Sequence, residues 1–266
     1  MVHATIRMDI SQEKAGEALE ISPWRCKKLR ETPKISKSLS NPRGASEMSV
    51  VEIEKDGTVA VIKMTNGENR HNKVFEESMR SALDEVAGDE SITAAVLTST
   101  DSKNWSQGID LEWLMQQMNE KNTDTIRHFL HGMDQVFRKL LVLPVPVIAA
   151  LNGHAYANGA IMATHCDFRF MRSDRGFFCL PEVNLDIQLS PAMHCLFLQK
   201  YPNSVFNRLI LTGERMTATE IVEHRIIEKA CANTEETMEE SMAFAKTFQK
   251  KRHTFGKLKQ MLNQPI

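Results

Sequence analysis

This chain has few cysteines and few aromatic residues, and neither positive nor negative charge is in excess. Its 266 residues include 5 cysteines, and 33 Lys and Arg oppose 34 Asp and Glu. The cysteines form no C-x-x-C pair and no zinc-like spacing, so we expect buried, reduced thiols rather than a metal site. A dedicated nucleic-acid binder needs clustered Lys and Arg, and the balanced charge excludes that class.

Long apolar runs are missing as well. The longest, from Leu140 to Leu151, is interrupted by Pro144 and Pro146, and it is shorter than the roughly 20 residues of a membrane-spanning helix. Residues 1–20 carry charges throughout and lack the apolar segment of a secretory signal. We therefore expect no membrane span and a cytoplasmic location, with an organelle matrix such as that of a peroxisome or mitochondrion as the alternative.

The pattern divides the chain into three parts. Residues 1–47 are mildly basic and rich in Ser, Lys and Pro, which is typical of a loosely structured extension. Residues 48–189 alternate apolar strands with amphipathic helices, the pattern of an α/β protein. From Ser190 onward the pattern is almost entirely helical, so residues 190–266 are predicted to form a C-terminal helical region.

The strongest local signals set the expected elements. Two strands flank the turn signal Asp56-Gly57 and predict a β-hairpin. Asn72 is suited to cap a helix that ends before Gly88. The remaining patterns predict strands at 94–97 and 145–151 and helices at 111–118 and 126–142.

Two glycine-bearing loops stand out, each between a predicted strand and a predicted helix. The first is 104–111, around Gly108, and the second is 152–163, around Gly159. Backbone amides at a helix start have no partner within the helix, so those of Ile109 and Asn158 are free to bind an anion. Either loop alone is typical of a tight turn without a ligand, but two such amides facing one point would form an oxyanion hole.

Together the loops resemble a known family. The run Ser106-Gln107-Gly108-Ile109-Asp110-Leu111 resembles the S-A-G-A-D-L motif of the enoyl-CoA hydratase/isomerase (crotonase) superfamily. Residues 149–155 through Cys166-Asp167-Phe168-Arg169 resemble its A-A-x-N-G-x-A-x-G-G-G…C-D-x-R motif, and Pro181-Glu182-Val183 matches its P-E-[VLI] motif. The three motifs occur in the family's order, and the resemblance spans residues 49–231.

The resemblance implies a fold, a substrate class and a set of site residues. The fold is an α/β spiral of strand–strand–helix repeats with C-terminal helices that pack a homotrimer or a dimer of trimers. The substrate is an acyl-CoA thioester; coenzyme A is part of it, and no further cofactor is implied. The oxyanion amides fall on Ile109 and Asn158, where alanine and glycine are usual. The neighbouring positions that would contact the substrate are Ser106, Gln107, Gly108, Asp110, Ala157 and Gly159.

The carboxylates distinguish the activities within the superfamily. Its hydratases use two glutamates to position and deprotonate a water molecule. In this chain the first of these two positions holds Ile161, which cannot transfer protons. The second holds Glu182, whose apolar neighbours favour a neutral acid and so a carboxyl suited to general base catalysis. One carboxylate suffices for a 1,3-proton shift. The pattern therefore resembles the Δ3,Δ2-enoyl-CoA isomerases of fatty acid β-oxidation, and residues 165–176 resemble the plant-type peroxisomal ones.

Two alternatives stay open at this point. Another enzyme of the superfamily, a hydratase or acyl-CoA hydrolase, could use Glu182 with water. A catalytically silent CoA-binding scaffold could keep the fold, and the unusual Asn158 with the apolar Ile161 leaves room for that hypothesis.

Other polar residues receive secondary roles. Asp186 and Glu214 are further candidate proton carriers, although solvated or capping roles are favoured. Asp167 and Arg169 are expected to support a strand by hydrogen bonds, and Lys257 and Lys259 to be solvated or to meet CoA phosphates. His154, His165 and His194 lack the spacing of metal ligands, so no metal is expected.

Overall fold

The computed structural model describes residues 49–264. The predicted extension at 1–47, with Cys26, lies outside this range, and residues 48–266 group as one compact unit. Within the described range no helix combines the length and apolar composition needed to cross a membrane.

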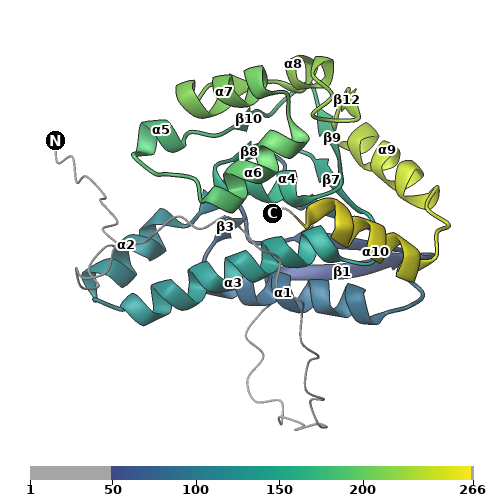
Figure 1. Ribbon diagram of the computed structural model, residues 1–266, viewed down its shortest axis with the longest axis horizontal. Coiled ribbons are helices and arrows are strands. Elements are labelled where there is room, and N and C mark those ends of the chain that lie inside the picture. Colours follow the sequence, from purple (N-terminus) through teal and green to yellow (C-terminus); the bar gives the residue numbers. More distant parts are fainter. Residues whose placement is uncertain (1–48, 265–266) are drawn as a thin grey trace, which may run out of the picture. The chain divides into compact units, whose positions relative to one another are not determined.

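A six-stranded sheet forms the centre of this unit (Figure 1). Its strands follow the order β1-β2-β4-β7-β9-β12, with β1 (Val51–Asp56) and β2 (Val59–Met64) forming the predicted hairpin around Gly57. The others run parallel to β2: β4 (Ala94–Ser99), β7 (Val147–Leu151), β9 (Phe168–Arg172) and β12 (Lys229–Cys231). Every residue of β4 and β7 is buried, which explains their continuous apolar character.

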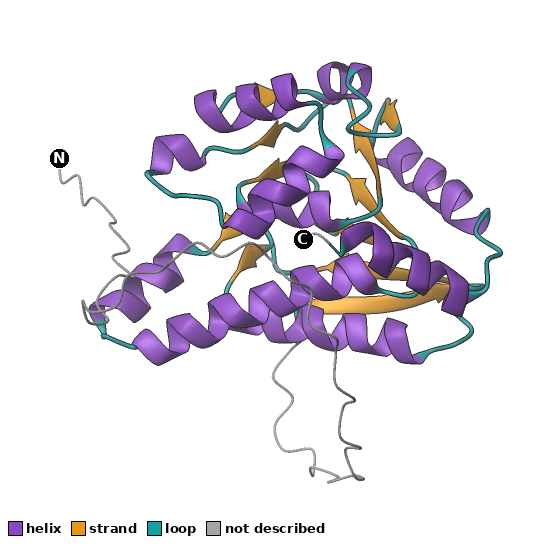
Figure 2. Cartoon of the chain, viewed as in Figure 1, coloured by secondary structure: helices purple, strands orange, loops and turns teal. Residues whose placement is uncertain are grey.

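A smaller sheet and a strand pair lie beside it (Figure 2). The smaller sheet has the order β11-β10-β8-β5, made of β5 (Asn104–Ser106), β8 (His154–Tyr156), β10 (Phe178–Cys179) and β11 (Arg215–Met216). The pair joins β3 (Arg70–His71) to β6 (Gly108–Ile109). Three repeats, β4–β5, β7–β8 and β9–β10, each give their first strand to the large sheet and their second to the small one. The predicted α/β spiral of strand–strand–helix repeats is therefore confirmed.

The helices of the core follow the predicted pattern with shifted ends. They are α1 (Lys73–Gly88), α2 (Leu111–Asn119), α3 (Thr123–Val142), α4 (Asn158–His165) and the short α5 (Glu182–Leu185). Asn72 caps α1 as predicted, since its side chain accepts a hydrogen bond from the Phe75 amide at 3.2 Å. Several ends differ from the prediction. Helix α1 runs through Gly88, α3 begins at Thr123, and β7 begins only after Pro146, which has no N–H to donate. Strand β4 and helix α2 extend one or two residues beyond their predicted ends.

The region from Ser190 onward is mostly helical. It holds α6 (Pro191–Lys200), α7 (Asn203–Thr212), α8 (Ala218–Glu223), α9 (Thr234–Lys246) and α10 (Arg252–Asn263). It also contains β11 and β12, two short strands that the pattern did not predict. Both join a sheet built by the preceding residues, so the helical pattern alone missed how this region attaches.

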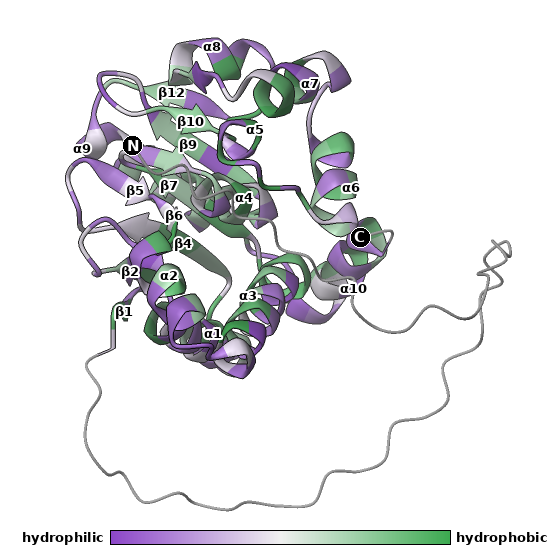
Figure 3. Cartoon of the chain, turned by 90° about the vertical axis from the view of Figure 1, so that its left-hand side faces the viewer, coloured by the Kyte–Doolittle hydropathy of each residue, from purple (hydrophilic) through white to green (hydrophobic). Residues whose placement is uncertain are grey.

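The core lies on both faces of the large sheet. One face packs against α1, α3 and α4 through side chains such as Phe75, Leu83 and Phe137. The other face packs against α9, with Phe170 and Phe244 among the contacts. Figure 3 shows both polar and apolar residues on α1 and α3, as expected for helices with one buried face.

The cysteines are largely as predicted. Cys166, Cys179 and Cys231 are free and buried. Cys195 is free but exposed, so the prediction of a buried thiol is wrong there. The buried residues of α6 are its neighbours Leu196 and Phe197. Cys195 lies on the exposed side of the same helix.

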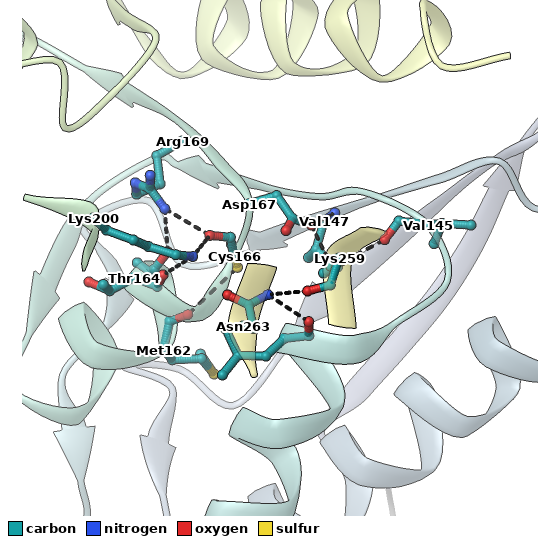
Figure 4. A network of polar contacts seen from close by, with 12 residues as sticks. Val145, Val147, Met162, Thr164, Cys166, Asp167, Arg169, Lys200, Lys259 and Asn263 are labelled. Atoms are coloured by element: carbon teal, nitrogen blue, oxygen red, sulfur yellow. Dashed lines mark hydrogen bonds and ion pairs between the residues drawn. The ribbon is translucent and has the colours of Figure 1, made fainter. Parts of the chain in front are cut away.

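A buried polar network closes the C-terminal end of α4 (Figure 4). Arg169 donates to the carbonyl oxygens of Cys166 at 2.8 Å and Ile226 at 2.7 Å, and Lys200 donates to those of Thr164 at 2.7 Å and Cys166 at 2.8 Å. Cations at this end complement the helix dipole. Arg169 therefore has the expected structural role, but its side chain holds the end of α4 and the segment before β12 rather than a strand.

Asp167 and Lys259 form the second half of the network (Figure 4). The Asp167 carboxylate accepts from the Val147 amide at 2.8 Å and pairs with Lys259 Nζ at 2.6 Å. Asp167 therefore supports the strand, as expected. The prediction for Lys259 is wrong, because its side chain is only 3% exposed and serves an internal ion pair that ties α10 to the start of β9.

Candidate active site

The two glycine-bearing loops lie in direct contact. A methyl group on Gly108 would lie 2.9 Å from the backbone nitrogen of Asn158, and one on Gly159 would lie 2.5 Å from the carbonyl oxygen of Ser106. Gly108 also has a φ of +79°, which disfavours any side chain. The structure thus brings together the two segments that the sequence singled out, and glycine permits their close approach.

Parallel strands of the small sheet aim three predicted site residues at one edge. β5, β8 and β10 are parallel neighbours, and Ile109, Asn158 and Glu182 each follow the carboxyl end of one of them. The Ala157 amide donates to the Cys179 carbonyl at 3.0 Å, which ties the β8 end to the β10 end. Ligand sites of open α/β sheets form at such carboxyl ends.

The start of α4 supplies a free donor. Asn158 is the first residue of α4, where backbone N–H groups have no partner within the helix. The preceding Ala157 adopts φ 48° and ψ −125°, a conformation that favours glycine. This strained turn directs the chain from β8 into the helix, and it sets the direction of the first helical amides.

Polar side chains in and beside the first loop form hydrogen bonds with nearby residues. Asp110 caps α2 by accepting from the Trp113 amide at 3.1 Å, and Gln107 Nε2 donates to Asn104 Oδ1 at 2.5 Å. Ser106 is fully buried, and its hydroxyl donates to the carbonyl of Asn69 at 2.8 Å. These side chains fix the loop backbone. Substrate contact by Ser106, Gln107, Gly108, Asp110, Ala157 and Gly159 stays a prediction.

Glu182 has the properties of a general base. It is 4% exposed, and its Oε2 atom has no hydrogen-bond partner within residues 49–264. Burial raises the pKa of its carboxyl to about 7, because desolvation disfavours the charged form. A carboxyl that titrates near neutrality can both take and return a proton.

The other candidate carboxylates are engaged elsewhere. Asp186 is exposed and ends α5 in the left-handed conformation, at φ 56°. Glu214 pairs with Arg208 at 2.5 Å. Ile161 is 3% exposed within α4 and offers only hydrocarbon. Asp186 thus fits the favoured capping role better than proton transfer, and Glu214 is held in an ion pair.

Sequence analysis missed one residue of this region, His71. Its ring is fully buried, with Nε2 2.9 Å from Ser106 Oγ and Nδ1 2.9 Å from the Asn158 side-chain nitrogen. Burial lowers its pKa to about 3, so the imidazole is neutral. The only local signal was its position just before the helix cap Asn72, which does not reveal contacts with two distant loops.

The other histidines described by the structure have separate surroundings. His165 is buried, bonds through Nδ1 to the carbonyl of Ile161 at 2.7 Å and stacks on Phe137. Across residues 49–264, no three His, Cys, Asp or Glu side chains gather as metal ligands. A cavity of about 320 Å³ between α1 and α3 is lined by Glu76 and His131 among others and by none of the predicted site residues.

Sequence comparisons show which known proteins this chain resembles. The family described as enoyl-CoA hydratase/isomerase matches residues 54–266. The peroxisomal enoyl-CoA delta isomerase 1 of Arabidopsis thaliana is 29% identical over 220 residues, covering 80% of this chain and 90% of that protein. The short-chain-enoyl-CoA hydratase of Clostridium acetobutylicum is 30% identical over 191 residues, 71% of each chain.

Solved structures share the fold. An enoyl-CoA hydratase from Bacillus halodurans superposes with a TM-score of 0.73 at 21% identity, over 80% of this chain and 86% of that one. DspI of Pseudomonas aeruginosa gives a TM-score of 0.73 at 19% identity, over 83% and 89%. With the family match over most of its length, the chain belongs to the enoyl-CoA hydratase/isomerase (crotonase) superfamily.

Proposed function

We propose that this protein is a Δ3,Δ2-enoyl-CoA isomerase acting on unsaturated fatty acyl-CoA in β-oxidation. The observation that carries the proposal is the buried carboxyl of Glu182, with a pKa of about 7, together with the apolar Ile161 at the position where hydratases of the superfamily carry a second glutamate. The named isomerases of Arabidopsis thaliana among its relatives support the same activity.

The mechanism uses Glu182 for both proton transfers. Its carboxylate takes a proton from C2 of the 3-enoyl thioester, and the electron pair moves into a dienolate whose negative charge rests on the thioester oxygen. The backbone amides of Ile109 and Asn158 hold that oxygen, where preorganised donors contribute most. The protonated Glu182 then returns the proton to C4, so the double bond moves from C3 to C2 and the enzyme is regenerated.

The thioester itself brings the coenzyme A, and the mechanism uses no further cofactor. We place the acyl-CoA against the backbone of Gly108 and Gly159, with Ser106, Gln107, Asp110 and Ala157 around them. The assembly we propose is a homotrimer or a dimer of trimers, packed through the C-terminal helices. An organelle matrix is the location we favour, since two isomerase relatives are named peroxisomal.

The test is to incubate the purified protein with a trans-3-enoyl-CoA of medium chain length and follow the conjugated 2-enoyl thioester by absorbance. A parallel reaction with 2-enoyl-CoA detects hydration, the activity named for the Clostridium relative. We expect the 2-enoyl product to form and persist, and Glu182→Gln to abolish its formation while acyl-CoA still binds. Loss of 2-enoyl-CoA to water would replace the isomerase with a hydratase, and binding without any turnover would indicate a silent scaffold.

A further inference from the structure

His71 lies between the two segments that carry the proposed oxyanion amides. In the strand pair β3–β6 its register partner is Ile109, and its carbonyl oxygen accepts from the Asp110 amide at 2.9 Å. Its side chain extends to the other segment, where Nδ1 lies 2.9 Å from Asn158 Nδ2. One residue therefore touches both loops, through its backbone on one side and its ring on the other.

The hydrogen bonds of the ring have one consistent direction. The Asn158 side-chain N–H can only donate, so Nδ1 accepts and the ring proton is on Nε2. That proton goes to Ser106 Oγ at 2.9 Å, and the Ser106 hydroxyl donates in turn to the Asn69 carbonyl at 2.8 Å. Ser106 Oγ also accepts from the Gly108 amide at 3.2 Å, within the first loop. The chain of donors is complete only when the imidazole is neutral.

The environment keeps the ring in this form and place. The imidazole is fully buried and stacks on Phe75, with ring centroids 4.3 Å apart. Burial lowers its pKa to about 3. A protonated ring would carry N–H groups on both nitrogens, and the Asn158 N–H would then face another donor.

We propose that His71 is a positioning residue that sets the distance between the Ile109 and Asn158 amides by tying the Asn158 side chain to Ser106. The inference rests on the proposed function, because it concerns the oxyanion hole of that reaction. It also gives Asn158 a reason to carry a side chain where glycine is usual in the superfamily: the residue is 7% exposed, and its side-chain amide is held by His71.

The first test is His71→Phe, which keeps a flat ring on Phe75 and removes both nitrogens. Displacing catalytic donors by a fraction of an ångström to 1 Å costs up to about 100-fold. We expect kcat for the 3-enoyl to 2-enoyl shift to fall by about 10- to 100-fold, with KM changed by less than about twofold. The matched control is His165→Phe, which removes another buried imidazole stacked on a phenylalanine; that ring bonds to the Ile161 carbonyl within α4 and not to Ser106 or Asn158, and kcat of this variant should stay unchanged.

A second readout needs no turnover. A 3-oxoacyl-CoA bound in an oxyanion hole is stabilised as its enolate, which absorbs in the near ultraviolet. We expect the bound enolate fraction to fall in His71→Phe and to stay constant in His165→Phe. If the wild-type chain binds the enolate but does not shift double bonds, the proposed function fails while the positioning role stands. An enolate fraction and kcat equal to those of the wild type in His71→Phe would overturn the positioning role alone.

Coupling between the partners gives the sharpest distinction from a merely structural role. Asn158→Gly keeps the backbone amide and removes the side chain that His71 holds. If His71 acts through Asn158, its effect should largely disappear once the Asn158 side chain is gone. Adding His71→Phe to the Asn158→Gly variant should then lower kcat by less than about a further twofold. Full additivity of the two losses would contradict the proposal. Should His71→Phe not fold, Ser106→Ala breaks the other end of the tie, and an unchanged enolate fraction there would overturn it.

Discussion

The two ends of α4 differ in how their polar groups are satisfied. At the C-terminal end, the carbonyls of Thr164 and Cys166 accept hydrogen bonds from Lys200 and Arg169. At the N-terminal end, Asn158 begins the helix and its backbone amide has no partner within the helix. The segment that follows β10, the strand beside β8, carries Glu182, whose Oε2 atom is buried without a partner within the described range. We infer that the hydrogen bonds at the C-terminal end stabilise the fold, whereas the unsatisfied groups on the N-terminal side are those that the proposed mechanism uses.

The largest effect is expected at the unsatisfied end. Glu182→Gln should reduce isomerase kcat by about 10²- to 10⁴-fold, the range for removing a general base. The same change should stabilise the fold at pH 8 by up to about 3 kcal/mol, because it removes the cost of ionising a carboxyl whose pKa is raised from 4.5 to about 7. Activity assays and urea unfolding check both, and a variant that loses stability together with activity would contradict the comparison.

The opposite response is expected at the satisfied end. Lys259→Met leaves Asp167 as an uncompensated carboxylate, 15% exposed, and should cost about 3–5 kcal/mol of unfolding free energy. The folded fraction should keep its kcat. Lys257→Met on the exposed side of the same helix is the control, and we expect it to change stability by less than about 0.5 kcal/mol. Equal losses from both substitutions would mean that the buried ion pair contributes nothing special.

The rate of isomerisation should also depend on pH, because Glu182 must be ionised to act as the base. The isomerase needs Glu182 as a carboxylate, and its pKa is raised to about 7, so kcat/KM should rise about tenfold per pH unit below that value and level off above it. A profile of kcat/KM from pH 5 to 9 measures this. A rate that is flat across pH 6–8 would mean that another group is the base.

Stability should show the pH dependence of the buried histidines. The pKa of His165 is lowered from 6.5 to about 3 by burial, so between these values the unfolded chain holds a proton that the folded chain lacks. Stability is therefore lost as the pH falls below about 6.5, by about 1.4 kcal/mol per pH unit for this residue. His165→Phe should remove this residue's share of the slope in urea unfolding at pH 4.5, 5.5 and 6.5, and the buried His71, whose pKa is also lowered to about 3, should retain its own share. The exposed His194→Phe is the control and should leave the slope as it is.

The smallest effect is expected at the turn into α4. Ala157→Gly relieves a backbone conformation with positive φ and should raise the free energy of unfolding by about 1 kcal/mol. Thermal or urea unfolding measures the change. A loss of stability would show that the Ala157 methyl group contributes packing that outweighs its backbone strain.

Much of the candidate site could be proposed from the sequence because its signals are local. The loop glycines, the positions of Ile109 and Asn158, and the change from a carboxylate to Ile161 are all visible in short runs of sequence. The roles of Lys259 and Cys195 were mispredicted for the opposite reason. Burial of Lys259 depends on where α10 docks, and its partner Asp167 is 92 residues away in the chain.

Apolar periodicity and motif spacing act over a few neighbouring residues, so the amino-acid sequence is enough to assign the α/β class and the family. Which buried groups meet depends on the tertiary fold. His71 reaches Ser106 and Asn158 across 35 and 87 residues of chain, and those contacts exist because parallel strand pairing brings three separate repeats to one edge. Hydrogen bonds between distant segments depend on strand register and burial, and neither can be predicted from the residues beside His71.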